Sequence, residues 1–457
     1  MFAASRPQRL AVATGFATAA AALGLLAGLD PRFAIAAALS AIFLLVVISD
    51  LYAGLVLFTL LSFLAVIPNF AGPAVSAIKL AGLLLALSWI ATLAARRDSK
   101  ADFLSAHPVV TFVLVAFLGW IAISQLWAED SAETLSALWR LSLNAILFLI
   151  IFTAVRTRAQ AMGVIGAFVA GASIQAVYGL LFVTPEGTES AARLASSIAN
   201  PNELAAALVA ALALAIGLAA ARRDSPPWRV RALMAAALCT GGVFLTGSRA
   251  GLVALGVALV AFMVIGGRSR GRFMFVAIAV VALGIGYYGY VASPEARERV
   301  ATVGDGTGRL DLWAVAWRIV EDKPLVGVGG GNFEVTSAHY LLEPGAIERD
   351  EFIIGQPKVA HNTYLEILAE LGVVGLFLFA SILAFGLFAS ARAAREFRRQ
   401  GDNAMELIAG ALFVALAAVL AADFFGSRHN EKELWLLLGL APALLAIARR
   451  QANASDA

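Results

Sequence analysis

The sequence predicts an all-α polytopic membrane protein with 12 to 14 transmembrane helices and one long, ordered loop on the outer side. Of its 457 residues, 61% are apolar and only 14% are charged, against about a quarter charged in a typical soluble protein. A water-soluble fold of this length cannot bury so much apolar surface. Leucine and alanine dominate the apolar runs, without the ten-residue alternating strips of a membrane barrel. The runs are therefore expected to be helices.

Apolar runs recur along the whole chain, and the expected number of spans is fourteen. Each span takes about 20 residues, and twelve spans result if two of the first four runs are re-entrant or peripheral. The first run follows Arg6 and Arg9, as in a signal peptide. Because it is longer than a signal core and further spans follow, we expect it to be the first transmembrane helix. The runs lie at about 10–29, 33–49, 51–67, 74–95, 108–126, 138–154, 160–183, 202–220, 232–247, 250–266, 273–292, 362–390, 403–425 and 434–448.

The distribution of basic residues predicts the orientation of the bundle. Alternate loops are short and basic, whereas the loops between them are acidic or neutral. By the positive-inside rule the basic loops and both termini are cytoplasmic. Because these residues flank apolar runs, the net charge of +3 does not indicate a nucleic-acid partner. The basic set is Arg6, Arg9, Arg96, Arg97, Lys100, Arg156, Arg158, Arg222, Arg223, Arg229, Arg231, Arg268, Arg270, Arg272, Arg392, Arg395, Arg398, Arg399, Arg449 and Arg450.

The chain divides into three predicted parts. Residues 1–292 form a transmembrane bundle of about eleven spans, 293–361 form an outer loop domain, and 362–457 carry about three C-terminal spans. Loops of this length are usually functional or disordered. This one contains helix signals, aromatic residues and Pro and Gly punctuation. We therefore expect an ordered cap over the outer face.

Two segments of the outer loop have recognisable local structure. A flexible glycine-containing turn leads into Arg309, and the following residues predict an amphipathic helix through about Glu321. The glycine-rich run from Pro324 to Asn332 misses the dinucleotide-binding pattern, because Asn332 occupies the position of its last glycine, and it predicts a tight turn. The expected apolar face of the helix is Leu310, Trp313, Trp317 and Val320.

Basic residues on the outer side are few, and two of them begin predicted helices. Ser248 is a favourable N-cap, which puts Arg249 in the first helical turn, and Arg309 begins the amphipathic helix. Exposed backbone amides together with a guanidinium suit a phosphate oxygen. The alternatives are an Arg249 that reaches toward lipid headgroups and an exposed Arg309 without a ligand.

The third chemical candidate is His361, which closes the outer loop directly before the next span. A histidine at this mouth suits a general base or a hydrogen-bond donor near neutral pH, and the alternative is a satisfied interfacial histidine. Glu366 and Glu370 follow at one-turn spacing inside an apolar helix, where acidic groups are costly and often functional. Pairing with a buried cation is the alternative for them.

A further helix start and two cations complete the candidate site. Asn200 is the expected cap of a helix with Pro201 in its first position, followed by Asn202. Arg193 precedes this start, and Lys79 lies near the outer end of the fourth span. Together with Glu366, these residues are candidates for contacts with a phosphate or a sugar, although structural anchoring explains Asn200 and Lys79 equally well.

Several other chemistries have no supporting pattern. Cys239 is the single cysteine, so no intramolecular disulfide is expected, and the four histidines show no zinc-binding spacing. No phosphate-binding P-loop occurs, and no Asp-x-Asp pattern for a metal-held nucleotide sugar occurs. We therefore expect no metal and no cofactor.

An ordered set of motifs resembles the O-antigen ligase family, which shares a superfamily with the polymerases of bacterial surface polysaccharides. The similarity is clearest from about 190 to 390. The motifs are Thr246-Gly-Ser-Arg249, Arg309-Leu-Asp-Leu-Trp313 continuing through Pro324–Gly329, and His361-Asn362 followed after nine residues by Gly372, with further similarity in Ser124–Asp130 and Asn200–Asn202.

The resemblance implies a multi-pass glycosyltransferase of the bacterial inner membrane with its active site and long loop on the periplasmic side. Such enzymes move a glycan from undecaprenyl pyrophosphate onto lipid A–core in ligases, or onto another lipid-linked repeat unit in polymerases. The resemblance implies that Arg249, Arg309 and His361 are essential. Two guanidinium groups can bind the departing pyrophosphate without a metal, and direct displacement predicts inversion. The two extra spans depart from the family's usual twelve.

A transporter or flippase for a lipid-linked sugar is the rival function. It predicts charged residues along a central path and usually an internal repeat. In this sequence the polar outliers gather toward the outer face, and no clear repeat is present. The ligase interpretation is therefore preferred, with the related polymerase as the nearer alternative.

Overall fold

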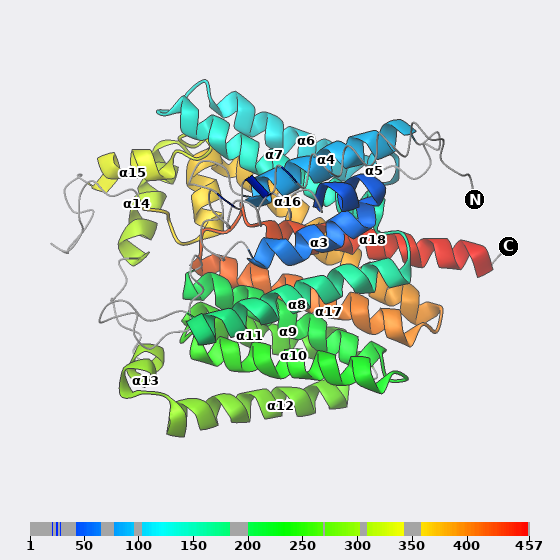
Figure 1. The fold of residues 1–457 in the computed structure, drawn as a ribbon. Helices are drawn as coiled ribbons and strands as arrows, with labels where there is room; N and C mark the ends of the chain where they lie inside the picture. Colours follow the sequence, from blue (N-terminus) through cyan, green and yellow to red (C-terminus); the bar gives the residue numbers. More distant parts are fainter. Residues whose placement is uncertain are drawn as a thin grey trace.

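The computed structural model consists of helices throughout the residues that it describes (Figure 1). This confirms the predicted all-α class, and it follows from a backbone that has to satisfy its hydrogen bonds within each apolar segment. Most of the predicted first span and most of the second lie outside the described residues. The structure describes residues 43–64, 77–95, 103–182, 200–267, 270–301, 309–341 and 358–455, together with Ala21, Gly24, Leu25 and Gly28.

Each predicted apolar run from residue 51 onward coincides with a helix. Seven of the described helices are long and apolar enough to cross a membrane, which confirms the polytopic class, whereas a total of 12 to 14 spans stays a prediction. The helices of these runs are α3 (Leu51–Leu64), α4 (Ala77–Ala95), α6 (Pro108–Ser124), α7 (Ser131–Ala154), α8 (Arg158–Phe182), α9 (Pro201–Ala221), α10 (Pro226–Leu245), α11 (Arg249–Ile265), α12 (Arg270–Gly286), α16 (Thr363–Arg399), α17 (Asn403–Ala422) and α18 (Lys432–Ser455), with the short α5 (Phe103–Ala106) before α6.

The alanine-rich helix α9 lies at the centre of the bundle and packs against α8, α10, α11 and α17. Small side chains let helix backbones approach closely where no hydrophobic effect drives them together. Gly217 of α9 faces Ala411 of α17 so closely that an added Cβ would overlap the alanine methyl group. Near the start of α9, Ala205 lies similarly close to Gly251 of α11, so tight packing holds this end of the helix as well.

Contacts between loops define one end of the bundle, which we call the basic end. Arg158 lies 2.6 Å from Asp402, and Arg398 donates to the carbonyl of Ile265 at 3.2 Å. The arginine-rich connections of the described residues therefore meet at the end where the C-terminal helix finishes (right in Figure 1). The opposite end, the cap end, carries the helices of the outer loop segment.

The cap end is built from α13 (Pro294–Ala301), α14 (Arg309–Asp322) and α15 (Phe333–Leu341). Helix α14 is amphipathic as predicted, but the predicted face is wrong, because Leu310 and Trp317 are 63% and 53% exposed. Both sides of the helix are apolar, so periodicity alone does not select the packed side. The buried side faces α16, and its residues are Leu312, Val315, Ala316, Ile319 and Val320.

Candidate functional site

The long helix α16 is interrupted at Gly372, whose backbone has φ 66° and ψ −171°. Such a break leaves carbonyl and amide groups without their helical partners, and inside a bundle these groups need replacements. The glycine-rich turn of the cap end supplies them, together with the indole of Trp120. The four replacement bonds run from Val328 N to Ala369 O (3.0 Å), from Gly329 N to Glu370 O (2.8 Å), from Val373 N to Pro324 O (2.9 Å) and from Trp120 Nε1 to Leu371 O (2.9 Å).

The backbone conformation of this turn explains why it contains several glycines. Gly327, Gly329 and Gly331 have φ values of 67°, 107° and 75°, a region that side chains rarely tolerate. A Cβ on Gly327 would also overlap the Glu370 carbonyl. The prediction of a tight turn is confirmed, and its role is to fix the cap segment to α16.

The Ser124–Asp130 motif holds this turn from the other side. The Ser124 hydroxyl accepts a hydrogen bond from Gly330 N at 3.0 Å. Asp130 N donates to the Asn332 side chain at 2.7 Å, and Asn332 Nδ2 donates back to the Asp130 carbonyl at 3.1 Å. Two segments about two hundred residues apart in the sequence therefore hold the glycine-rich turn in place.

Two helix N-termini meet beside Arg249. The Ser248 hydroxyl caps α11 by accepting from Gly251 N at 3.1 Å, and it donates to the Asn202 side-chain oxygen at 2.6 Å. Asn200 caps α9 by accepting from Asn202 N at 3.0 Å. The predicted caps are confirmed. Because α9 and α11 start together, their free amides face the same region of the cap end.

The structure brings Arg249, Arg309 and His361 into one electrostatic neighbourhood. Burial lowers the pKa of the Arg309 guanidinium, and the positive charge of Arg249 lowers it further. Burial also lowers the pKa of His361, followed by the charges of Arg309 and Lys358. Arg249 is exposed, and the other two side chains are half-buried. All three lie at or next to a helix N-terminus, where negative charge is favoured.

His361 is held in an unusual conformation. It is the non-glycine residue with positive φ, 52°, in the described part of the chain. A backbone of this kind persists when its surroundings fix it. Asn362 caps α16 through Tyr364 N and Leu365 N, both at 3.1 Å, and Thr363 N donates to the Gly426 carbonyl at 2.9 Å. Nothing in the residues around His361 indicates this strain before folding.

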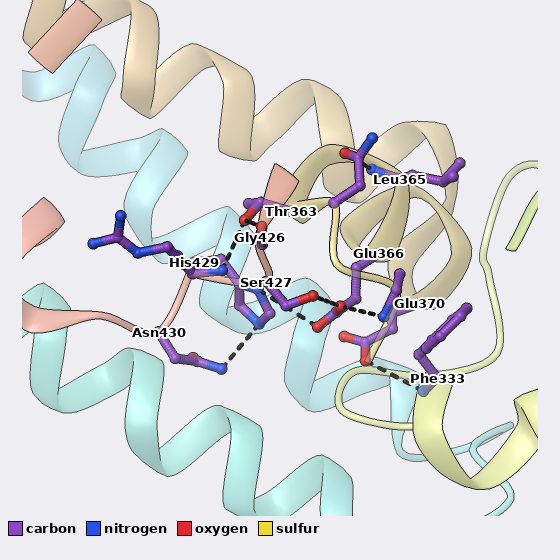
Figure 2. A network of polar contacts seen from close by, with 12 residues as sticks. Phe333, Thr363, Leu365, Glu366, Glu370, Gly426, Ser427, His429 and Asn430 are labelled. Carbon is purple, nitrogen blue, oxygen red and sulfur yellow. Dashed lines mark hydrogen bonds and ion pairs between the residues drawn. The ribbon is translucent and has the colours of Figure 1, made fainter. Parts of the chain in front are cut away.

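A buried network behind His361 joins two loops (Figure 2). Glu366 accepts from Ala360 N at 3.0 Å and from the Ser427 hydroxyl, and His429 Nδ1 lies 3.9 Å from its other oxygen. Burial, followed by the charge of Arg140, lowers the pKa of His429 to about 4, so this imidazole is neutral near pH 7. Glu366 therefore fixes the backbone before His361, and its predicted contact with substrate stays a prediction.

Glu370, the second predicted acid of α16, is also inside the protein. Its carboxylate accepts from Phe333 N at 3.2 Å, which binds the start of α15 to α16 (Figure 2). Acidic groups at this depth need such partners, because an unpaired polar group in an apolar bundle is costly. The hydrogen-bond partner found here is a backbone amide. Pairing with a buried cation was the alternative expected from the sequence, and among the described residues no cation lies within ion-pair distance of Glu370.

A pocket at the cap end adjoins His361 and contains residues that the sequence analysis missed, above all Ser427 and Arg428. One signal was present: Gly426-Ser-Arg428 repeats the tripeptide Gly247-Ser-Arg249 in another connection between two predicted spans. The lining residues are Asn200, Asn202, Glu203, Val359, His361, Ala422, Phe425, Gly426, Ser427 and Arg428.

The two remaining candidates are not tested by this geometry. Lys79 belongs to α4, but its side chain lies outside the described residues, and Arg193 lies outside them altogether. Asn200 and Asn202 are therefore the predicted substrate-binding residues that the structure brings to the pocket together with His361.

The fold and the site together define an all-helical membrane protein with a basic, helix-terminated site at one end. Residues 234–380 match the sequence model of the O-antigen ligase family. Over 216 residues the chain is 30% identical to an O-antigen ligase from Pseudomonas aeruginosa, which covers 47% of this chain and 46% of that protein. The chain thus spans about half the length of the curated relative it matches. The resemblance to the O-antigen ligase family predicted from the motifs is confirmed.

Proposed function

We propose that this protein is an inner-membrane glycosyltransferase of the O-antigen ligase type. It moves a glycan from undecaprenyl pyrophosphate onto a sugar of lipid A–core at the periplasmic face. The family match over 234–380 supports the reaction class. The observation that carries the proposal is that Arg309 lies at a helix N-terminus of the cap end within electrostatic range of both Arg249 and His361, which also lie at or next to helix N-termini.

The two arginines are suited to the donor pyrophosphate. Among the described residues, neither Arg249 nor Arg309 lies within ion-pair distance of a carboxylate. Their charges are therefore available to a ligand, and two planar forks match the oxygens of a diphosphate. The same contacts strengthen as negative charge grows on the departing phosphate oxygen. These contacts bind the carrier lipid and promote its departure. The reaction needs no ATP, because cleavage of the sugar–phosphate bond supplies the free energy.

His361 is suited to the acceptor hydroxyl. Its lowered pKa keeps the imidazole neutral near pH 7, and a neutral imidazole can take a proton. As the acceptor oxygen bonds to the anomeric carbon, the bond from that carbon to the phosphate oxygen breaks. His361 receives the hydroxyl proton, and undecaprenyl pyrophosphate leaves with the electron pair. Attack opposite the leaving group inverts the anomeric configuration.

The charge distribution of the bundle supports the proposed orientation. With the basic end in the cytoplasm, the positive-inside rule is obeyed. The outer loop segment at the cap end, 293–361, then forms a periplasmic domain between the bundle of 1–292 and the C-terminal spans of 362–457. Both termini are then cytoplasmic, and the lipid tail of the donor stays among membrane lipids while its glycan reaches the site.

A reconstituted assay tests the proposal. Purified protein in lipid nanodiscs receives a defined undecaprenyl-pyrophosphate glycan, with or without lipid A–core, and products are separated by mass. Glycan attached to core, with release of the carrier lipid, is the expected result. Extension of the lipid-linked glycan without core would instead identify a polymerase. Movement of the intact lipid across a vesicle bilayer without transfer would identify a flippase.

A further inference from the structure

Arg428 is the most unusual cation of the cap end. It lies in the connection between α17 and α18, and its side chain is only 4% exposed. Nevertheless, within the part of the chain that the structure describes, its Nε and Nη1 atoms have no hydrogen-bond acceptor, and its ion-pair partner Asp423 lies 3.9 Å away. A buried guanidinium with unused donors is costly, and such a group calls for an explanation. A ligand that accepts these hydrogen bonds provides one.

Arg428 is one of the residues that line the pocket at the cap end, together with Glu203, Asn200, Asn202 and Ser427. A carboxylate and the nearby Asp423 make this pocket unsuited to a second phosphate. The mixture of strong donors and strong acceptors suits groups that donate and accept at once, as sugar hydroxyls do.

The position of His361 relates the pocket to the proposed reaction. His361 lines the pocket, whereas Arg249 and Arg309 do not, although Arg309 is close enough to affect the imidazole. His361 therefore lines the pocket and is also near Arg309. In a displacement the incoming hydroxyl needs the base beside it, with the leaving group on the other side. Because His361 lines the pocket, a sugar bound there would present its hydroxyl to this base.

We propose that this pocket is an acceptor-sugar subsite, in which the buried guanidinium of Arg428 donates hydrogen bonds to a hydroxyl of the acceptor and the Glu203 carboxylate accepts one. Arg428 is then a specificity-determining residue. This inference rests on the proposed function and adds the recognition of the acceptor to it. The pocket offers about 50 Å³ to water-sized groups, which admits the hydroxyl-bearing edge of a ring but not the whole sugar.

Transfer kinetics of the full-length protein in nanodiscs test the subsite, with lipid A–core oligosaccharide as the varied acceptor. Arg428→Gln and Arg428→Lys are expected to raise the acceptor KM at least about tenfold, because hydrogen bonds to the charged donor are lost or misplaced. The donor KM and the slow release of glycan to water without acceptor stay within about twofold. Arg158→Gln, which removes an arginine at the basic end, is the matched control and keeps the wild-type acceptor KM.

Folding is controlled separately. Arg428→Gln leaves Asp423 buried without a cation, which can destabilise the protein. The double variant Arg428→Gln/Asp423→Asn removes both charges, and Asp423→Asn alone isolates the second change. Thermal unfolding and gel filtration establish which variants are native. An unchanged acceptor KM in a native Arg428 variant, or an equal rise of the donor KM, overturns the inference.

A measurement on the wild-type protein needs no variant. Acceptor oligosaccharides that each lack one hydroxyl are compared by saturation-transfer NMR binding and by transfer. One of them is expected to lose at least about tenfold in binding, because a site built to bond a hydroxyl rejects its absence. Equal binding of all of them refutes the subsite. A wild-type protein that releases no glycan from the donor refutes the proposed function instead, so the two failures are distinguishable.

Discussion

The two ends of the bundle both use arginine, but they use it differently. At the basic end Arg158 and Arg398 are partly exposed and reach carboxylates at 2.6 and 2.7 Å. At the cap end Arg249 and Arg309 influence each other as like charges, and among the described residues no carboxylate lies within ion-pair distance of either. The two pairs of arginines therefore differ in pairing: those at the basic end meet carboxylates, and those at the cap end do not meet any among the described residues.

This difference distinguishes structural from chemical use of a cation. An exposed pair joins two loops and contributes little to stability, about 0.2–1 kcal/mol. Two neighbouring like charges are unfavourable for the empty protein, and they are useful where an anionic ligand neutralises them. The cap end therefore has the features of a binding site, and the basic end has those of a solvated membrane boundary.

Removal of the cap-end arginines is expected to give the largest effect. Arg249→Ala and Arg309→Ala each reduce transfer by about 10³-fold, the upper range for one transition-state donor. Arg→Lys at either position also impairs transfer, because a point charge replaces a bidentate fork. Initial rates in nanodiscs measure this, and Arg158→Ala serves as the control that retains transfer.

Thermal unfolding of the Arg249 and Arg309 variants gives a second comparison of the two ends. Because each cap-end substitution removes one of two like charges, the midpoint of thermal unfolding is expected to stay equal or rise. Wild-type transfer in both cap-end variants, or a loss in Arg158→Ala as large as theirs, would show that the two ends do not differ as described.

His361 gives the next effect, about 100-fold for His361→Gln, the lower end of what a general base contributes. Glutamine keeps a polar side chain but takes no proton. Burial and the charge of Arg309 lower the pKa of His361 below its ordinary value of 6.5. Since only the neutral imidazole accepts a proton, transfer is expected to decline as pH falls, with the midpoint of the decline below pH 6.5. The rate measured against pH in the native and Gln variants tests this, and a decline centred above pH 6.5 would contradict it.

Local features were predictable from the sequence alone. The apolar runs, the caps at Asn200 and Ser248 and the glycine-rich turn depend on neighbouring residues, so their patterns were sufficient. The gathering of basic loops at one end follows from alternating spans. The three chemical candidates followed from helix starts and from their positions in the outer connections, the family resemblance added that they are essential, and their roles stay proposals.

Features that depend on distant segments were not predictable. The break of α16 at Gly372 is stable only because the turn after Pro324 occupies it, and nothing near Gly372 in the sequence encodes that contact. Helix α14 has two apolar sides, so the packed side was decided by α16 rather than by periodicity. Arg428 resembled another loop residue until folding buried it beside His361.

Substitution of one glycine at each end of the bundle compares the two ends through the free energy of unfolding. Gly401 has φ 72°, where alanine costs about 1–2 kcal/mol in backbone conformation. Gly372 combines φ 66° with ψ −171°, a region almost confined to glycine, where a side chain costs about 1–3 kcal/mol. A Cβ at Gly401 meets nothing within 4 Å, whereas one at Gly372 overlaps the Leu325 carbonyl. Gly372→Ala is therefore expected to lower the free energy of unfolding by at least about 1 kcal/mol more than Gly401→Ala. Thermal unfolding of the two variants measures this, and equal midpoints would mean that the turn does not seat in the break.

The smallest effect is expected from the ion pair of the basic end. Asp402 caps α17 by accepting from Met405 N at 3.2 Å, so Asp402→Asn keeps a capping side chain while it removes the charge that pairs with Arg158. With Arg158 44% exposed, solvent and salt screen the pair. A double-mutant cycle of Asp402→Asn and Arg158→Gln should give a coupling energy of about 0.5 kcal/mol, decreasing with added salt, with transfer unchanged. A salt-independent coupling of several kcal/mol would place this pair among buried ones, and the basic end would then be as specialised as the cap end.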